Sequence, residues 1–252
     1  MNDNPLRLED VSLSFGAVAV FRDLSLKVSR GEFVAVVGPS GCGKTTLLNL
    51  FSKFLKPETG RVECAGRVRM VYQHDSLFPW LTVAQNISLG LRHLSDDSDR
   101  ARQLEDMLHL IRLEEFANHY PHQLSGGMRQ RVELGRALIG DTDILLMDEP
   151  FSSLDYLTRL RMRNELARML DQLPRTVVLV THDIEESAQL ADRIVVLSER
   201  PARICCEFEL NLDRPREPTH PRVVDTVHKI LAEMGLEHKA SAAVSSDLIF
   251  SA

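Results

Sequence analysis

One segment of the chain combines glycines, a lysine and a threonine at the spacing that phosphate binding requires. Residues 38–45 read Gly-Pro-Ser-Gly-Cys-Gly-Lys-Thr and match the pattern G-x-x-x-x-G-K-[ST]. Glycines let backbone N–H groups surround phosphate oxygens, and the N-terminus of a following helix adds partial positive charge. We expect Lys44 to reach the β- and γ-phosphates of a nucleotide and Thr45 to offer its hydroxyl to Mg²⁺.

This phosphate loop predicts nucleotide binding but not a reaction, because kinases and GTPases carry the same pattern. A plain glycine turn is the structural alternative, but the buried strand predicted before the loop and the helix predicted after it favour phosphate binding. The residues expected to contact the nucleotide here are Gly38, Pro39, Ser40, Gly41, Cys42, Gly43, Lys44, Thr45 and Thr46.

Two adjacent acids, Asp148 and Glu149, follow the apolar run 144–147. At the end of a buried strand, Asp148 is expected to hold the Mg²⁺ shell. Glu149 is expected to accept a proton from an attacking water. Taken alone, the pair could be two solvated acids at a strand end; the phosphate loop about a hundred residues upstream favours the chemical interpretation.

A second phosphate-binding segment is predicted at Ser125, Gly126 and Gly127, directly before a helical run. One nucleotide does not need two separate cradles. Two cradles are useful if two subunits close head-to-tail and each binds the ATP held by the other. A flexible loop with a serine N-cap is the alternative for this segment.

Cys42 lies inside the phosphate loop, close to a predicted helix N-terminus. Such an environment lowers the pKa of a thiol, so ATP is expected to protect Cys42 from alkylation. In the alternative, Cys42 is a small filler residue that is turned away from solvent.

The apolar periodicity predicts strands that alternate with helices, and therefore an α/β sheet with helices on its faces. Predicted strands cover residues 6–15, 21–28, 33–37, 62–64, 68–72, 144–147, 177–180, 194–197 and 203–208. Predicted helices cover 44–54, 158–173 and 223–234, together with a mainly helical stretch, 82–139, that is broken at 95–99 and 120–127. That stretch implies a helical subdomain, about 75–140, inserted into a domain of residues 5–235. Closely spaced prolines indicate a linker-like tail, 200–252, with one helix.

The bulk composition argues against a nucleic-acid partner, because the 252 residues carry a net charge of −6. The arginines at 159, 161, 163 and 168 come closest to a basic cluster, and helical spacing is expected to spread them round a solvated face. Four cysteines without zinc-site spacing fit reduced thiols. No apolar run approaches the ~20 residues that span a bilayer, and residues 1–10 do not resemble a signal peptide, so the chain is expected in the cytosol or on a cytosolic surface.

Further motifs occur in an order and spacing that resemble the ABC ATPase family over nearly the whole chain. Residues 124–130, Leu-Ser-Gly-Gly-Met-Arg-Gln, look like its signature motif, with Met128 where glutamine is commonest. The other matching positions are Phe15 in Ser-Phe-Gly, Gln73, Asp155 in Ser-Leu-Asp, and His182 in Val-Thr-His-Asp. Read singly, Phe15 could be a core residue, Gln73 a solvated glutamine and His182 a histidine satisfied within the fold.

The resemblance implies a P-loop NTPase (RecA-like) core with an antiparallel β subdomain and an inserted α-helical signature subdomain. It further implies that Phe15 stacks on adenine, that Asp155 lies at a dimer interface and that His182 contacts the γ-phosphate. Gln73 would sense Mg²⁺ and couple to a membrane partner. The implied catalytic residues are Glu149, His182, Lys44 and Gln73, and the implied Mg²⁺ residues are Thr45, Gln73 and Asp148.

Finer features resemble the nitrate, sulfonate and taurine importer group: residues 78–83, the Met128 signature variant, and residues 198–201 followed by 214–216. The resemblance implies an ATP-hydrolysing, Mg²⁺-dependent motor subunit of an importer that takes up a small anion or related solute, peripheral on the cytoplasmic face of the inner membrane. It would form a homodimer that sandwiches ATP, bind an integral membrane permease near residues 73–80, and act indirectly with a periplasmic solute-binding protein. Trp80, in that segment, could instead pack into the helical subdomain. Two alternative functions are a non-transport ABC ATPase and a P-loop small-molecule kinase.

Overall fold

The central element is a six-stranded sheet with the strand order β5–β6–β7–β3–β8–β9. A computed structural model describes residues 3–73 and 76–235; the predicted tail beyond 235 and the first residue of the predicted helical subdomain lie outside this part. Strands β3 (Phe33–Val37), β6 (Ile144–Asp148) and β7 (Thr176–Val180) are buried along their whole length. Their continuous apolar sequences are typical of parallel strands covered on both faces.

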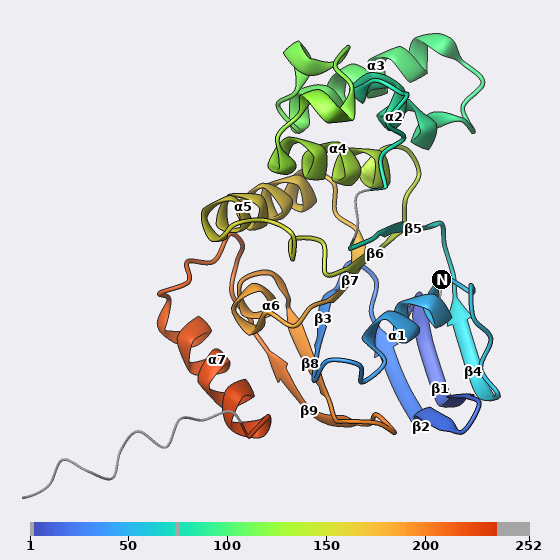
Figure 1. Cartoon of the computed structure of the whole chain (residues 1–252), viewed down its shortest axis with the longest axis vertical. Coiled ribbons are helices and arrows are strands. Elements are labelled where there is room, and N and C mark those ends of the chain that lie inside the picture. The colour runs from blue at the N-terminus through green and yellow to red at the C-terminus, as the bar shows by residue number, and fades with distance from the viewer. Residues whose placement is uncertain (1–2, 74–75, 236–252) are drawn as a thin grey trace, which may run out of the picture.

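The sheet is parallel except at one edge. Strands β5 (Val68–Val71) and β8 (Arg193–Leu197) pair in parallel with their neighbours, whereas β9 (Ile204–Glu209) runs antiparallel to β8. A second, antiparallel sheet is formed by β2 (Val18–Val28), β1 (Leu6–Phe15) and β4 (Thr59–Cys64). It packs with α1 (Lys44–Phe51) over one face of the central sheet, where these elements share one apolar core (Figure 1).

Helices cover the opposite face of the central sheet and build a separate lobe. Helices α5 (Tyr156–Gln172), α6 (Ile184–Leu190) and α7 (Pro221–Glu233) contribute to the core on that face. The lobe at the top of Figure 1 contains α2 (Val83–Ser88), α3 (Asp97–Leu110) and α4 (Gly126–Leu138), with 3₁₀ turns at Leu89–Leu91, Glu114–Phe116 and Pro121–Gln123. The expected α/β class with an antiparallel subdomain and inserted helices is confirmed.

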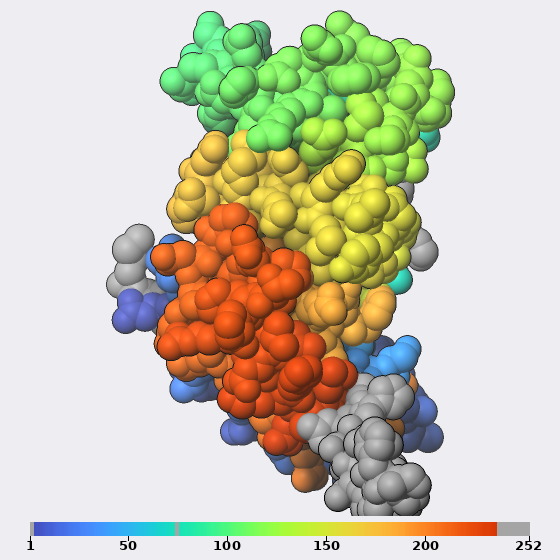
Figure 2. Space-filling view, turned by 90° about the vertical axis from the view of Figure 1, so that its left-hand side faces the viewer, coloured from blue at the N-terminus to red at the C-terminus, as the bar shows by residue number. Residues whose placement is uncertain are grey.

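Residues 200–235, which the proline spacing predicted as a linker-like tail, are packed against the body of the domain. Strand β9 completes the central sheet, and α7 lies on α6. Figure 2 shows this segment covering the face below α5. The Arg216 side chain is buried and donates to the carbonyl oxygens of Ala188, Ala191 and Leu210, so it caps the C-terminal end of α6.

Cys42 belongs to the core between the two sheets rather than to the solvent side of the phosphate loop. It is only 1% exposed and packs in the same cluster as Val20 and Leu47. Burial raises the pKa of the Cys42 thiol and outweighs the opposing charge of Lys44. The expectation of a reactive thiol is therefore wrong, and the alternative of a small filler residue is confirmed.

We predict that N-ethylmaleimide labels Cys42 in the folded chain far more slowly than Cys205, the exposed cysteine of the same polypeptide. The rate should be the same with and without Mg-ATP, because core packing and not the nucleotide covers the thiol. Peptide mapping by mass spectrometry measures both cysteines in one sample. Rapid labelling of Cys42 that ATP suppresses would contradict this assignment.

Candidate active site

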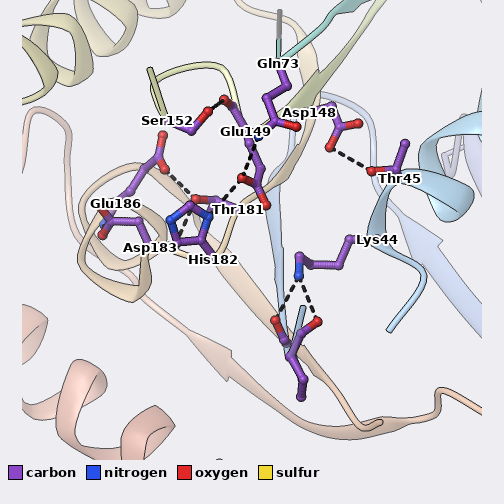
Figure 3. Close-up of polar contacts among 12 residues, drawn as sticks. Lys44, Thr45, Gln73, Asp148, Glu149, Ser152, Thr181, His182, Asp183 and Glu186 are labelled. Atoms are coloured by element: carbon purple, nitrogen blue, oxygen red, sulfur yellow. Dashed lines mark hydrogen bonds and ion pairs between the residues drawn. The ribbon is translucent and has the colours of Figure 1, made fainter. Parts of the chain in front are cut away.

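The parallel pairing of β6, β7 and β3 brings three chemically important segments to one edge of the sheet. The phosphate loop follows β3, the two acids end β6, and Thr181 with His182 follows β7. The carboxyl ends of adjacent parallel strands are the usual place for ligand binding in open α/β sheets. Figure 3 shows that the side chains of Lys44, Asp148, Glu149 and His182 gather there.

The phosphate loop is held tightly against β2. A Cβ atom added to Gly43, which has φ 117°, would lie 2.5 Å from the Val20 side chain. Only glycine therefore fits this position. Lys44, the first residue of α1, is buried and its ammonium group donates to the carbonyl oxygens of Gly38 at 2.8 Å and Pro39 at 3.1 Å. The positive charge is thus held inside the loop that precedes the helix.

Thr45 and Asp148 form a pair of oxygen ligands suitable for Mg²⁺. The Thr45 hydroxyl donates to Asp148 Oδ1 at 3.1 Å. Burial raises the pKa of Asp148, and the Thr45 hydrogen bond opposes that rise. Among residues 3–73 and 76–235, no group of three or more His, Cys, Asp and Glu side chains forms a metal cage. The two oxygens fit the usual protein share of a Mg²⁺ shell that is completed by substrate phosphates and water.

Glu149 is the point where three of the predicted catalytic residues meet. Its Oε2 atom accepts a hydrogen bond from Gln73 Nε2 at 3.4 Å and lies 2.9 Å from His182 Nδ1. The backbone of Glu149 is left-handed, with φ 45°, and its N–H donates to Val180 O at 2.8 Å. A non-glycine residue in this conformation carries local strain that its surroundings must hold. The bend directs the carboxylate toward Gln73 and His182 (Figure 3).

The second predicted cradle is well formed but does not meet the first within one chain. Ser125 is the N-cap of α4 and accepts a hydrogen bond from Met128 N at 3.3 Å. Gly126 and Gly127 begin α4 in the helical lobe, whereas the phosphate loop precedes α1, on the face of the central sheet that also carries the antiparallel sheet (Figure 1). The backbone N–H groups at the start of α4 are suited to an anion brought by another molecule.

Two further predicted residues lie at element boundaries. Phe15 ends β1 and is 53% exposed, which excludes the interpretation of Phe15 as a core residue and leaves its ring free to stack on a base. Asp155 is the N-cap of α5 and accepts a hydrogen bond from Thr158 N at 3.0 Å. Hydrogen bonds from Thr158 lower the pKa of Asp155. Asp155 therefore starts the helix as an exposed carboxylate.

An exposed aromatic pair follows Gln73 in sequence. Trp80 is 69% exposed, so the alternative that it packs into the helical lobe is wrong. Its ring lies 5.4 Å from that of Phe78. Buried Asn86 holds the turn beneath them: its side chain accepts from Phe78 N at 2.9 Å and donates to Leu81 O at 3.0 Å. The aromatic pair is thus presented on a rigid turn.

A groove of 540 Å³ opens beside this turn, between the central sheet and the helical lobe. Its walls include Tyr72, Phe78, Arg69 and Arg92. The Ser76 hydroxyl donates to Glu133 of α4 at 2.8 Å, and Arg136 donates to Ser76 O at 3.0 Å. The signature helix therefore holds the segment that leaves Gln73.

Sequence reasoning missed a buried network behind His182. Arg163 is only 2% exposed and pairs with Asp183, which contradicts the expectation that the α5 arginines all lie on a solvated face. Glu186 is buried and accepts from the Thr181 hydroxyl at 2.6 Å. Burial raises the pKa of Glu186 to about 7. The Asp183-x-x-Glu186 spacing, typical of a helix start, was the available signal for both α6 and this network.

Comparison with known proteins identifies the family to which the chain belongs. The family model described as ABC transporter matches residues 21–152. The taurine import ATP-binding protein of Pelagibacter ubique is 42% identical over 202 residues, covering 77% of this chain and 76% of that protein. The aliphatic sulfonates import ATP-binding protein of Shouchella clausii is 40% identical over 228 residues, covering 90% of each.

Solved structures agree with the sequence comparison. A dimeric bacterial ABC transporter cassette matches with a TM-score of 0.70 and 30% identity, covering 82% of this chain and 99% of that one. A dimeric cassette in a post-hydrolysis state, bound to ADP and Pi, matches with a TM-score of 0.69. With the phosphate loop, the paired acids and the signature segment in place, the chain belongs to the ABC transporter family.

Proposed function

We propose that this chain is the ATP-hydrolysing motor subunit of an importer for a small sulfonate-type anion. The observation that carries the proposal is the meeting of Gln73 and His182 at one carboxylate oxygen of Glu149, beside the phosphate loop. A kinase has no use for the second cradle at Ser125. The relatives named for taurine and aliphatic sulfonates support the cargo class.

ATP is bound between two copies of the chain in this proposal. The loop 38–46 and Lys44 hold the phosphates, Phe15 stacks on adenine, and Thr45 with Asp148 holds Mg²⁺ together with Gln73. Ser125, Gly126 and Gly127 of a second copy complete the site, with Asp155 at the interface. The dimeric state of the matched cassette structure supports this arrangement. Because the γ-phosphate is shared, its removal weakens the closed state relative to the open one.

Glu149 and His182 carry the hydrolytic step in this proposal. The Glu149 carboxylate accepts a proton from the water that attacks the γ-phosphate, and bound Mg²⁺ supplies charge neutralisation on the phosphate oxygens. His182, in contact with the same carboxylate, orients the water and the γ-phosphate. Gln73 approaches that carboxylate from the loop that leads to the groove, so it joins the chemistry to the partner surface.

The partner for the groove is an integral membrane permease. The rigid turn of Phe78 and Trp80 beside an open groove is a combination suited to a protein interface, where aromatic anchors are common. No helix among the described residues reaches the length and apolarity that a membrane crossing demands. In this proposal, which the import ATP-binding relatives support, the subunit works as a peripheral protein on the cytoplasmic face of the inner membrane, and a periplasmic solute-binding protein delivers the cargo to the permease.

The variant Glu149→Gln tests the proposed hydrolysis. It should keep ATP binding and lose about 10²–10⁴ in turnover, because the proton acceptor is removed. With Mg-ATP it should accumulate as a closed dimer in size-exclusion chromatography. Glu185→Gln, a change at the exposed acid in the first turn of α6, is the matched control and should behave as wild type.

The same pair of variants also tests the transport assignment in cells. Growth on taurine or an alkanesulfonate as sole sulfur source should fail with Glu149→Gln and persist with Glu185→Gln. Wild-type hydrolysis by Glu149→Gln would refute the catalytic assignment. ATP-dependent phosphorylation of a small acceptor by the wild-type chain would favour the kinase alternative.

Lys44→Ala and Ser125→Ala separate the two cradles. Lys44→Ala should weaken ATP binding to the monomer, because it removes a charge inside the phosphate loop. Ser125→Ala should leave monomer binding nearly unchanged and reduce cooperative hydrolysis, since its site is offered to the other copy. Fluorescent-nucleotide titration at low protein concentration, followed by ATPase assays across protein concentrations, checks both. Equal losses of monomer affinity would argue against a two-subunit site.

Trp80 reports on the partner surface, because it is the sole tryptophan of the chain. In the isolated subunit its emission should be red-shifted and readily quenched by acrylamide, and binding of the permease should shift it to the blue. Trp80→Ala should reduce co-purification with the membrane fraction and spare ATP binding. Val224→Ala, at an exposed apolar residue of α7, is the control. Unchanged co-purification of Trp80→Ala would exclude this surface.

A further inference from the structure

The backbone on either side of His182 is held by a partly buried charge network that reaches into α5. Asp183, the residue after His182, is paired through Oδ2 with Arg163 and, at 3.2 Å, with Arg159. Its Oδ1 accepts from Glu186 N at 2.9 Å, and its own N–H donates to the Thr181 hydroxyl at 3.0 Å. The two residues that flank His182 are therefore held by hydrogen bonds, and the anchoring charges come from a different helix.

The first two turns of α5 also support the signature segment. An added Cβ on Gly127 would lie 3.0 Å from Thr158 Cγ2, and one on Gly126 would lie 3.4 Å from Leu154 Cδ2. The Arg159 side chain donates to Leu154 O at 3.1 Å. Arg159, which pairs with Asp183, is therefore hydrogen-bonded to Leu154, the residue that lies against Gly126. The start of α5 thus contacts the signature glycines on one side and the histidine segment on the other.

We propose that Arg163, with Arg159, is a positioning residue that links the signature segment of each chain to the His182 of the same chain. The inference rests on the proposed two-subunit site, in which the signature segment binds the ATP of the other copy. Engagement of that ATP moves the start of α5, and the Arg163–Asp183 pair carries the movement to His182 at the chain's own ATP. The network thereby couples the two ATP sites of the dimer.

The burial of the network is a strong reason to assign it a role beyond stability. In the described part of the chain, Arg163 Nε and Nη1 and Glu186 Oε1 are buried atoms without a hydrogen-bond partner. Buried unsatisfied polar atoms cost stability and call for an explanation. Because the unpaired Arg163 donors and the unpaired Glu186 acceptor belong to one network, these side chains can form new hydrogen bonds within it when α5 shifts. A buried ion pair is in general weak evidence for stability, and a switching role is among its better-attested uses.

These contacts form a continuous path from the signature segment through α5 to His182. A measurement of the energetic coupling between two residues on this path tests whether it links the two ATP sites. A double-mutant cycle between Arg163 and His182 provides it. The variants are Arg163→Met, His182→Ala and the double variant in the purified full chain, assayed with Mg-ATP for kcat, KM and the Hill coefficient. Arg161→Met, at an exposed position of the same helix, is the matched control.

If Arg163 acts through His182, Arg163→Met should lower kcat by about tenfold or more, and the same change in a His182→Ala background should cost less than about twofold, because residues that act as a unit are non-additive. The Hill coefficient should fall toward 1, while ATP binding to the monomer stays unchanged. Arg163→Lys should restore part of the cooperativity. Arg161→Met should match wild type.

Multiplicative losses in the double variant, or an equal loss from Arg161→Met, would overturn the inference and leave the proposed function intact. Wild-type turnover by His182→Ala would overturn both. If Arg163→Met does not fold, Arg159→Met replaces it in the double-mutant cycle, because Arg159 pairs with the same Asp183 oxygen and is less buried. Thermal unfolding of every variant separates loss of coupling from loss of structure.

Discussion

The parallel pairing of β6, β7 and β3 is the constraint on which the rest of the molecule depends. Their register puts Asp148 opposite Val180 and sets the loop after β3 at the same edge. Asp148, Glu149 and His182 then lie at or directly after strand ends, and Lys44 and Thr45 begin the helix that follows the loop after β3. A slip of one residue in this pairing would exchange the side chains that face the two apolar cores, and the packing of each core on its own face of the sheet opposes such a slip.

Polar side chains that take no part in the hydrolysis hold the segments around the site in place. Asn86 fixes the turn that presents Trp80, Glu133 and Arg136 hold Ser76 beyond Gln73, and Arg216 caps the far end of the helix that begins after His182. Each of these side chains is bonded to backbone or to a loop residue. The segments that lead to and from the site are thereby held in place by hydrogen bonds to the scaffold.

Much of this arrangement was predictable, and the failures have physical causes. The strand, loop and helix around the phosphate loop follow from strong local patterns, as does the class of sheet. Helix α6 was missed because it is seven residues long and carries buried polar side chains where periodicity expects apolar ones. Arg163 and Cys42 were misjudged because their environment depends on distant segments: α6 covers the former, and the antiparallel sheet covers the latter. Helical spacing predicts on which face of a helix a side chain lies, but it does not predict which distant segment packs against that face.

The exposed aromatic side chains affect the solubility of the free subunit. Phe54, Phe78 and Trp80 leave large apolar area in water on a chain whose net charge is modest. Such area favours self-association of the free subunit, and the rigid turn under Trp80 means that little ordering entropy opposes capture by any apolar surface. Any contact that covers these side chains therefore also raises the colloidal solubility of the chain.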